Sequence, residues 1–245
     1  MKTSNGMKDI ILLPTYNERE NVKIIIPEIF ELIPEIFILV VDDNSPDGTA
    51  GVVKELMGKY PDLSILERKD KTGLGNAYKE AMKKVIGDKE ARSVITMDAD
   101  GSHSPQYLRE FLDNIEKYDL IIGSRYVAGG GIENWELWRK NLSRFGNLYA
   151  KILTGLPIND FTAGFMCIRR EFLTKLDFSR IGASGYSFLI ELKFYLINKL
   201  GAKVKEVPII FKSRREGESK ISNQIIREGM KTPWRLFLKR IWRRK

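Results

Sequence analysis

The chain has 245 residues, 43% of them apolar and 30% charged, and its net charge is +9 at neutral pH. This composition supports a hydrophobic core and excludes a disordered chain, a collagen and a disulfide-stapled miniprotein. No apolar run approaches the roughly 20 residues that cross a bilayer. No apolar stretch follows the amino-terminal residues either, which argues against a signal peptide and predicts a protein of the cytosol or a cytosolic membrane face.

Short β-rich segments alternate with helical patterns up to residue 123. Continuously apolar segments such as 36–41 are typical of a parallel sheet that helices cover on both faces. The alternation predicts an open, doubly wound and mostly parallel α/β sheet. The predicted strands are 9–13, 36–41, 63–67, 93–97 and 120–123, and the predicted helices between them are 18–33, 49–59, 74–86 and 105–117.

The pattern changes after residue 123, where Gly129 to Gly131 form a glycine-rich loop. No internal repeat or low-complexity linker follows, so we predict one domain over residues 1–221 and a helical tail over 222–245. Within the domain we expect a helix over 135–153, a strand over 165–169, a helix over 187–200 and a strand over 204–211.

The chain has one cysteine, Cys167, and one histidine, His103. No internal disulfide can form, and a tetrahedral zinc site is disfavoured, so a functional metal should be a hard cation held by oxygen. Cys167 falls in a predicted strand, and we interpret it as an inert core thiol rather than half of a Cys–His nucleophilic pair.

The positive charge is concentrated at the carboxyl end. Residues 222–245 hold eight basic residues and one acidic residue, whereas the other 221 residues carry a net charge of only +2. Thr232 and Pro233 are the predicted start of a helix. We expect this helix to lie in a membrane interface and contact anionic lipid, in preference to packing its apolar stripe on the domain or binding nucleic acid. The apolar stripe is Trp234, Phe237, Leu238, Ile241 and Trp242, and the basic side is Arg235, Lys239, Arg240, Arg243 and Arg244.

Acidic pairs follow two of the predicted strands. Asp42 and Asp43 end the second strand, and Asp98 and Asp100 end the fourth. Since ligands bind at the carboxyl ends of parallel strands, we expect the four acids to cluster around a cation that relieves their repulsion. An oxygen-only site suits Mg²⁺ or Mn²⁺ bridging the protein to a diphosphate. For Asp42 and Asp47, a helix cap is an equally good explanation.

Other phosphate and sugar motifs fit less well. No G-x-x-x-x-G-K-[ST] segment is present, and Tyr78 stands where a dinucleotide fingerprint has its third glycine. Gly73 and Gly75 either open a helix beside a ligand or simply end a loop. Two-carboxylate glycosidase chemistry stays a formal alternative, but an Asp-x-Asp on one strand end indicates a metal.

Eight short segments complete the pattern, at residues 14–18, 42–49, 73–78, 98–100, 123–126, 139–146, 160–165 and 217–220. The segments that occur together in the narrowest group of proteins are Ser-Pro-Asp-Gly-Thr, Gly-Ser-Arg-Tyr and Gly-Glu-Ser-Lys. With these segments, the chain from about residue 8 to 222 resembles the inverting nucleotide-sugar glycosyltransferases of family 2. Within that family it is similar to the dolichyl-phosphate (polyprenyl-phosphate) mannose synthases. Gly101 departs from the family's more usual Leu.

The resemblance implies a GT-A-like fold and GDP-mannose as the donor. It makes Asp100 the main metal ligand, bound to the diphosphate, with Asp98 and Ser102 assisting, although some relatives carry Gln at the position of Ser102. The residues expected to contact the sugar nucleotide or its phosphates are Arg125, Arg214 and Lys220. The residues expected to hold the base and ribose are Pro14, Tyr16, Glu18, Val41 and Asp43, with Asp98 and Ala99 alongside.

The acceptor implied by the resemblance is dolichyl (polyprenyl) phosphate, with Arg139 and Ser143 at its phosphate. A monophosphate has its second pKa near about 6, so it is mostly dianionic at neutral pH and needs no general base. A bidentate Arg139 then positions the phosphate for in-line attack. For His103 we favour a turn-capping or indirect role over catalysis. The tail would hold this peripheral enzyme on the cytoplasmic face of a membrane, and a membrane-spanning partner subunit stays open.

Two alternatives remain from the sequence. The first is a polyprenyl-phosphate glucosyltransferase that uses UDP-glucose. The second is a non-catalytic membrane-binding or regulatory subunit, against which the strand-end acids and the basic donors argue. A sugar-nucleotide pyrophosphorylase is disfavoured, because its glycine- and lysine-rich loop is absent after the first predicted strand.

Overall fold

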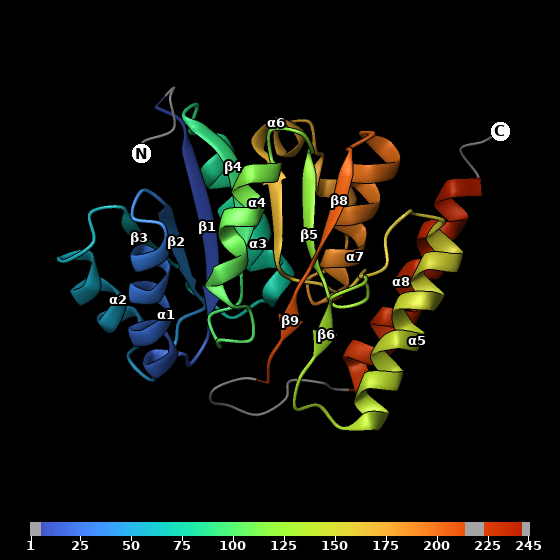
Figure 1. Cartoon of the computed structure of the whole chain (residues 1–245), viewed down its shortest axis with the longest axis horizontal. Helices are drawn as coiled ribbons and strands as arrows, with labels where there is room; N and C mark the ends of the chain where they lie inside the picture. Colours follow the sequence, from blue (N-terminus) through green and yellow to red (C-terminus); the bar gives the residue numbers. More distant parts are fainter. Residues whose placement is uncertain (1–5, 214–222, 242–245) are drawn as a thin grey trace.

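The computed structural model describes residues 6–213 and 223–241. In this part of the chain a seven-stranded sheet has the order β3-β2-β1-β4-β7-β5-β8, and a small sheet of β6 and β9 lies beside it (Figure 1). The strands are β1 (Lys8–Thr15), β2 (Phe37–Asp42), β3 (Leu63–Glu67), β4 (Ala91–Thr96), β5 (Leu120–Ser124), β6 (Gly131–Ile132), β7 (Met166–Arg169), β8 (Val204–Pro208) and β9 (Ile210–Phe211).

The large sheet is parallel except at β7, which is antiparallel to both β4 and β5. Its central strands are apolar on both faces, and Ile11, Leu12 and Leu13 are fully buried, because helices cover both sides. The predicted mostly parallel, doubly wound sheet is confirmed. Cys167 of β7 is buried, and burial raises the pKa of its thiol to about 12, so it is the inert core residue expected.

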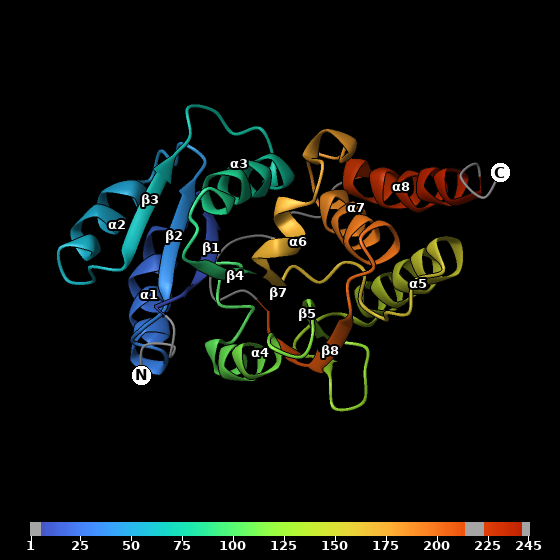
Figure 2. The ribbon, with the colours of Figure 1, turned by 90° about the horizontal axis from the view of Figure 1, so that it is seen from above.

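Helices cover the sheet on both faces (Figure 2). One face packs against α1 (Arg19–Leu32), α2 (Thr49–Met57) and α4 (Leu108–Asn114). The other packs against α3 (Leu74–Ile86), α6 (Arg170–Thr174) and α7 (Ser187–Phe194). Two apolar cores, one on each side of the sheet, result from this arrangement.

The glycines that begin α3 allow a close approach to the start of α7. The N–H of Gly75 donates to the carbonyl oxygen of Ser184 (2.7 Å). A Cβ atom on Gly75 would come within 2.6 Å of the Cβ of Phe188. Packing between α3 and α7 therefore explains Gly75, and the predicted opening of a helix by these glycines is confirmed.

Three predicted elements are divided in the structure. The predicted helix over 105–117 is a 3₁₀ turn (Pro105–Tyr107) followed by α4, and the one over 187–200 is α7 followed by a π-helical turn (Tyr195–Lys199). Asn114 closes α4, since its side chain donates to the carbonyl oxygen of Glu110. The predicted strand over 204–211 breaks after Pro208, which has no N–H for the ladder, and β9 then pairs with β6.

Helices α5 (Leu137–Thr154) and α8 (Asn223–Ile241) lie side by side at one end of the molecule, with α8 also packed on α7 (Figures 1 and 2). The predicted helix start at Thr232–Pro233 is wrong, because α8 continues through Pro233. Thr232 and Leu236 are buried there, so packing sustains the helix past the proline. Within residues 6–213 and 223–241, no helix combines the length and the hydrophobicity that spanning a bilayer requires.

Candidate active site

The Asp-x-Asp segment directly follows β4, at the carboxyl edge of the sheet. The N–H of Asp98 donates to Nδ1 of His103 (3.0 Å), and Oδ1 of Asp100 accepts a hydrogen bond from the N–H of Ser102 (3.0 Å). Gly101 has a φ of +76°, in the left-handed region that glycine occupies without strain. The chain thus folds back on itself, which holds both carboxylates at the end of β4.

His103 is a structural part of this turn. Its ring lies against Phe165 and Phe211, with centroids 5.0 and 5.4 Å away, and it is almost fully buried. Burial lowers the pKa of His103, so the ring is neutral, and the hydrogen bond accepted by Nδ1 places its proton on Nε2. The turn-capping contact favoured from the sequence is therefore present in the structure.

The second acidic pair does not join the first. Asp42 accepts hydrogen bonds from the hydroxyls of Thr15 (2.9 Å) and Ser45 (2.6 Å), and Asp43 is paired with Arg68. Strand β1 lies between β2 and β4, so their ends are separated by two strand spacings, about 10 Å. Within the described ranges, no three His, Cys, Asp or Glu side chains are grouped so as to hold a metal ion. The predicted four-acid cluster is therefore wrong.

Arg125 follows β5 and is held by the loop between α5 and β7. Its Nε and Nη2 donate to the two oxygens of Asp160 (2.7 Å each), and Nη2 also donates to the hydroxyl of Thr162 (2.7 Å). Burial opposes the charge on both Arg125 and Asp160. Their ion pair outweighs it, so the pKa of Arg125 is raised and that of Asp160 is lowered. This bidentate pair fixes the orientation of the guanidinium.

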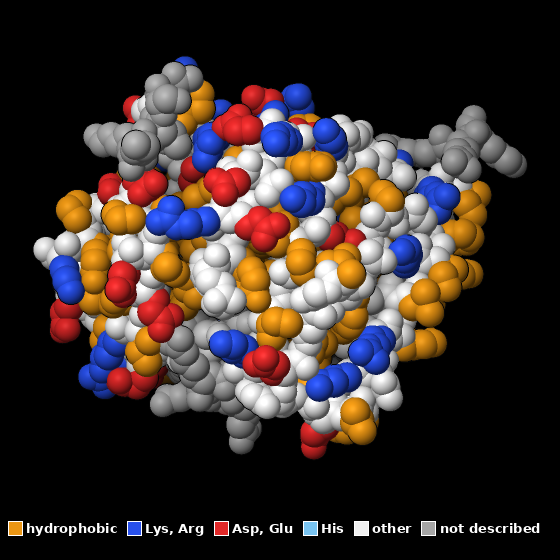
Figure 3. All heavy atoms as spheres, in the orientation of Figure 1, with side chains coloured by type: hydrophobic (Ala, Val, Ile, Leu, Met, Phe, Trp, Pro, Cys, Tyr) orange, Lys and Arg blue, Asp and Glu red, His pale blue; other side chains and the backbone are white. Residues whose placement is uncertain are grey.

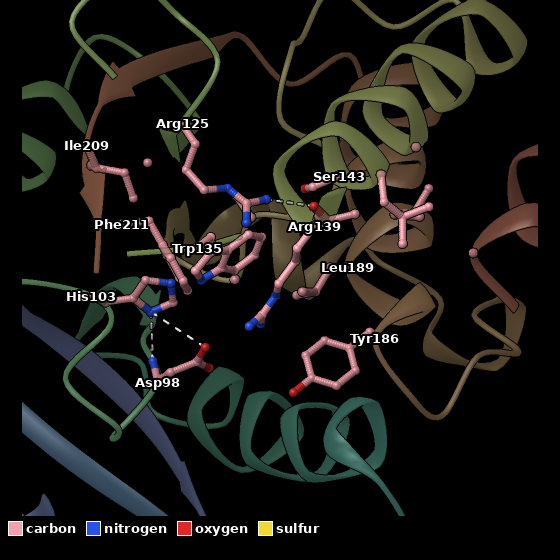
Figure 4. A pocket seen from close by; sticks show the side chains of 18 of the residues that line it. Asp98, His103, Arg125, Trp135, Arg139, Ser143, Tyr186, Leu189, Ile209 and Phe211 are labelled. Atoms are coloured by element: carbon pink, nitrogen blue, oxygen red, sulfur yellow. Dashed lines mark hydrogen bonds and ion pairs between the residues drawn. The ribbon is translucent and has the colours of Figure 1, made fainter. Parts of the chain in front are cut away.

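A cavity of about 500 Å³ lies beside these groups (Figure 4). The predicted site residues Asp98, Asp100, Arg125, Arg139 and Ser143 all line it. The cavity combines their charged and polar groups with an extensive apolar wall. Residues of that wall include Leu142, Phe145, Leu189, Ile190, Ile209 and Phe211.

Arg139 and Ser143 belong to α5. The Arg139 guanidinium lies over the ring of Trp135, 3.8 Å from its centroid, and the hydroxyl of Tyr126 donates to Oγ of Ser143 (2.6 Å). In Figure 4 the Arg139 side chain extends from α5 into the cavity, and Arg125 enters it from the end of β5. Two guanidinium groups from distant parts of the sequence therefore face the same space.

The residues expected at the base and ribose do not line this cavity. They lie at or just beyond the carboxyl ends of β1, β2 and β4, and the ammonium of Lys71 lies 3.4 Å from the centroid of the Tyr16 ring. Arg214 and Lys220 lie outside the described residues. The residues at these strand ends are Pro14, Tyr16, Glu18, Val41, Asp43 and Ala99.

The segment after β4 suits a hard divalent cation. Oγ of Ser102 is buried and has no hydrogen-bond partner in residues 6–213 or 223–241, which is unusual for a buried hydroxyl. Asp98 and Asp100 lie on the same short segment and add carboxylate oxygens. Mg²⁺ and Mn²⁺ prefer such ligands, and Mg²⁺ commonly uses one or two carboxylates together with substrate phosphates. The donor set therefore fits the metal predicted from the sequence.

Helix α5 exposes apolar side chains and buries polar ones. Trp138, Phe145 and Ile152 are 57%, 66% and 69% exposed, whereas Asn147 and Thr154 are buried. Figure 3 shows hydrophobic side chains along the margin of the molecule formed by α5. Sequence reasoning missed this surface, although the spacing of its apolar residues was visible in the predicted helix over 135–153.

Helix α8 exposes Trp234 and Leu238 beside this surface. Three of its basic side chains also contact the protein, although Arg235 and Lys239 stay exposed, and their predicted contact with lipid remains a prediction. The protein groups that they contact include the carboxylate of Glu191, which is buried, and the carbonyl groups that end α5. Arg235 pairs with Glu191, Lys239 donates to the hydroxyl of Tyr195 (3.0 Å), and Arg240 donates to the carbonyl oxygen of Thr154 (3.0 Å). Trp242, Arg243 and Arg244 lie outside the described residues.

A parallel sheet with an Asp-x-Asp at the end of an inner strand, beside a cavity with two guanidinium groups, is the arrangement expected of a GT-A glycosyltransferase. The chain belongs to glycosyl transferase family 2, whose model matches residues 10–177. The family predicted from the sequence is therefore confirmed.

Two curated relatives align over most of the chain. The polyprenol monophosphomannose synthase of Mycolicibacterium smegmatis is 44% identical over 226 residues, covering 91% of this chain and 84% of that protein. The undecaprenyl-phosphate mannosyltransferase of Micrococcus luteus is 37% identical over 236 residues and covers 96% of both chains.

Solved structures support the fold. Glucosyl-3-phosphoglycerate synthase from Mycobacterium tuberculosis, in complex with Mn²⁺, UDP-glucose and phosphoglyceric acid, is similar with a TM-score of 0.70. The similarity covers 95% of this chain and 80% of that one, at 19% identity. A likeness at this identity shows the fold alone, and it confirms the GT-A-like architecture.

Proposed function

We propose that this glycosyltransferase moves mannose from GDP-mannose to a polyprenyl phosphate such as dolichyl phosphate. The observation that carries the proposal is a single cavity that joins Asp98 and Asp100, Arg125 and Arg139 to an apolar wall. The acids and cations suit two phosphate-bearing substrates, and the wall suits an isoprenoid chain. The names of the two relatives, which specify polyprenol and undecaprenyl phosphate, support the lipid acceptor.

The strand ends would bind the donor. Asp98 and Asp100, with Ser102 assisting, would hold Mg²⁺ or Mn²⁺, and such an ion neutralises charge that develops on a departing diphosphate. Arg125 adds a fixed cation on the same cavity, and Arg214 and Lys220 are proposed to contact the same phosphates. The proposed contacts to the base and ribose are Pro14, Tyr16, Glu18, Val41, Asp43 and Ala99.

Arg139 and Ser143 would position the acceptor phosphate. Stacking on Trp135 limits the motion of the Arg139 guanidinium, so its two parallel N–H groups can donate hydrogen bonds to two phosphate oxygens. An oxygen of the lipid phosphate then forms a bond to C1 of mannose as the bond from C1 to the GDP oxygen breaks, with inversion at C1. The dianionic phosphate has no proton to lose, so the cavity needs no general base.

The outer faces of α5 and α8 would rest on the membrane that holds the acceptor. Their exposed apolar side chains border the cavity that contains Arg139, and both Phe145 and Met230 are at once exposed and part of its lining. A lipid phosphate could thereby reach Arg139 while its chain stays in an apolar environment. Peripheral attachment at the cytoplasmic face and a membrane-spanning partner subunit stay predictions.

The decisive experiment incubates the protein with radiolabelled GDP-mannose, dolichyl phosphate and Mg²⁺, followed by extraction into organic solvent. We expect label in the organic phase, and EDTA should abolish it. A parallel reaction with radiolabelled UDP-glucose tests the other donor. Label from UDP-glucose alone would overturn the choice of sugar nucleotide, and label from neither would overturn the proposed reaction.

The variant Asp100→Ala separates an enzyme from a non-catalytic subunit. We expect it to lose transfer in reconstituted membranes while it keeps its fold, as measured by circular dichroism. Unchanged transfer with this variant would mean that another protein supplies the catalytic centre.

A further inference from the structure

A buried lysine lies behind the cavity. Lys193 of α7 is 0% exposed, and its Nζ donates to the carbonyl oxygens of Phe161 (2.9 Å) and Ala163 (2.7 Å). These two carbonyls flank Thr162, one of the two side chains that hold Arg125. A buried ammonium is costly unless it makes strong hydrogen bonds, so its presence here calls for a reason.

Side chains from other elements hold the rest of this loop. The carboxylate of Glu206, on β8, accepts hydrogen bonds from the N–H groups of Asn159 (2.9 Å) and Asp160 (3.0 Å). The side-chain oxygen of Asn147, on α5, accepts one from the N–H of Phe161 (2.6 Å). Side chains therefore satisfy many of the loop's backbone groups, and its shape depends on them.

The positive charge of Lys193 balances the charges of the groups around the loop. The loop brings together the cations Arg125 and Lys193 and the anions Asp160 and Glu206, so the group is neutral overall when the lysine is protonated. Glu206 and Lys193 both bond to backbone groups of the loop that carries Asp160.

We propose that Lys193 is a positioning residue for sugar transfer: it fixes the carbonyls of Phe161 and Ala163 and so keeps Asp160 and Thr162 aligned with Arg125. Hydrogen bonds from a charged donor are roughly twice as strong as neutral ones, which suits an ammonium for this task. The inference rests on the proposed function, because transfer is the activity on which it acts.

The charge of Lys193 depends on pH. Burial lowers the pKa of its ammonium to about 7, with Asp160 and Glu206 opposing this shift and Arg125 adding to it. The ammonium therefore loses its proton as the pH rises above about 7, and both bonds to the loop weaken. Arg125 and Asp160 keep their charges over this range because each stabilises the other.

The first test compares Lys193→Met, which cannot donate, with Lys193→Arg, which keeps a charged donor. We expect kcat to fall about a hundredfold in the Met variant, with KM for the donor changed by less than about threefold, because misplacement of a contacting group acts mainly on turnover. The Arg variant should recover at least a tenth of the wild-type kcat.

Arg170→Met is the matched control. Arg170 also bonds a carbonyl, that of Ile86 (2.6 Å), but at the far end of α3 from the cavity. We expect this variant to keep the wild-type kcat. An equal loss of kcat in Arg170→Met and Lys193→Met would show a general effect on folding and overturn the assignment.

The pH profile separates positioning from simple support. The ratio of wild-type kcat to that of Lys193→Arg should fall severalfold between pH 6 and pH 8.5, because arginine stays charged throughout. Taking the ratio cancels the ionisation of the acceptor phosphate. A constant ratio would overturn the proposal.

Amide hydrogen exchange over residues 159–163 tests the same idea without substrates. Lys193→Met should lose protection there and Arg170→Met should keep it; unchanged protection in Lys193→Met would contradict the proposal. If the wild-type protein transfers no mannose, the proposed function fails, whereas the exchange result still decides whether Lys193 orders the loop. Should the Met variant not fold, exchange in the wild type at pH 6 and pH 8.5, corrected for intrinsic rates, provides the same test.

Discussion

Helices α3 and α5 are both amphipathic, but they turn opposite faces to the protein. Helix α3 buries Ala77, Tyr78, Ala81 and Met82 against the sheet and exposes lysines. Helix α5 buries Asn147 and Thr154 and exposes its tryptophan, phenylalanine and isoleucine. The periodicity of a helix thus identifies its two faces without saying which one meets the protein.

This difference divides the molecule into two parts. Near α3, the apolar face of each helix finds its partner in the chain itself, as in an ordinary α/β domain. At α5 and α8, polar contacts and the buried side chains of Ala150 and Leu236 attach the helices to the body, while large apolar side chains on their outer faces stay exposed. Because the cavity opens at this second part, we infer that its partner is the lipid phase that delivers the acceptor.

The largest expected effect comes from a charge placed on the buried face of α3. Ala81→Asp would bury an unpaired carboxylate in the core and should lower the free energy of unfolding by about 4 kcal/mol. Chemical denaturation followed by circular dichroism measures this loss. A loss below about 1 kcal/mol would mean that α3 is not packed as described.

The same charge on the exposed face of α5 should leave the fold intact and disturb membrane contact. We expect Phe145→Asp to change the free energy of unfolding by less than about 0.5 kcal/mol. Binding to anionic vesicles should fall roughly a hundredfold, because the contact between the aromatic ring and the lipid is lost and a negative charge is placed against a negative surface. Vesicle sedimentation measures the binding.

Ile24→Asp is the matched control for this prediction. Ile24 is an exposed apolar residue of α1, on the part of the molecule away from α5 (Figure 1). Its variant should bind vesicles like the wild type. Equal losses in both variants would mean that vesicle binding reflects net charge rather than the surface on α5.

Transfer activity also distinguishes the two parts, because only the part formed by α5 and α8 should contact the lipid. With dolichyl phosphate in vesicles, Phe145→Asp should raise KM for the acceptor about tenfold or more, in line with lost binding energy that is the same in the ground and transition states. With a short-chain polyprenyl phosphate in solution the change should be several times smaller. An equal rise of KM for both acceptors would mean that Phe145 contacts the acceptor in the cavity and does not act through the membrane.

Sequence alone predicted the parts of the molecule that short-range patterns encode. The strand over 63–67 and the helix over 74–86 agree with the structure residue for residue, because glycines and the apolar spacing mark their limits. The antiparallel direction of β7 was not predicted. A strand apolar on both faces, such as Met166–Arg169, has the same pattern whichever way it runs.

At the candidate site, sequence reasoning named five residues that the structure brings to one cavity, but it missed the charges that surround them. Arg68 neutralises Asp43 across 25 residues, and Asp160 holds Arg125 across 35, so no local pattern reveals either pair. Lys193 lies in a helix that is buried on all sides, where a lysine is not expected. Such pairings depend on tertiary contacts, and only the folded chain shows them.

The smallest expected effect distinguishes two basic residues of α8, Lys231 and Arg235. Lys231 is exposed, and Lys231→Gln should weaken binding to anionic vesicles about fivefold, since one basic residue near such a surface contributes roughly 1 kcal/mol. Arg235 is engaged with the buried Glu191, so Arg235→Gln should change vesicle binding by less than about twofold while it lowers the melting temperature. A membrane-facing Arg235 would reverse this order, because its loss would then weaken vesicle binding as much as that of Lys231 and spare the fold. The pair of variants therefore decides whether α8 meets lipid through the apolar stripe predicted from the sequence, as its exposed tryptophan and leucine indicate, or through its basic side.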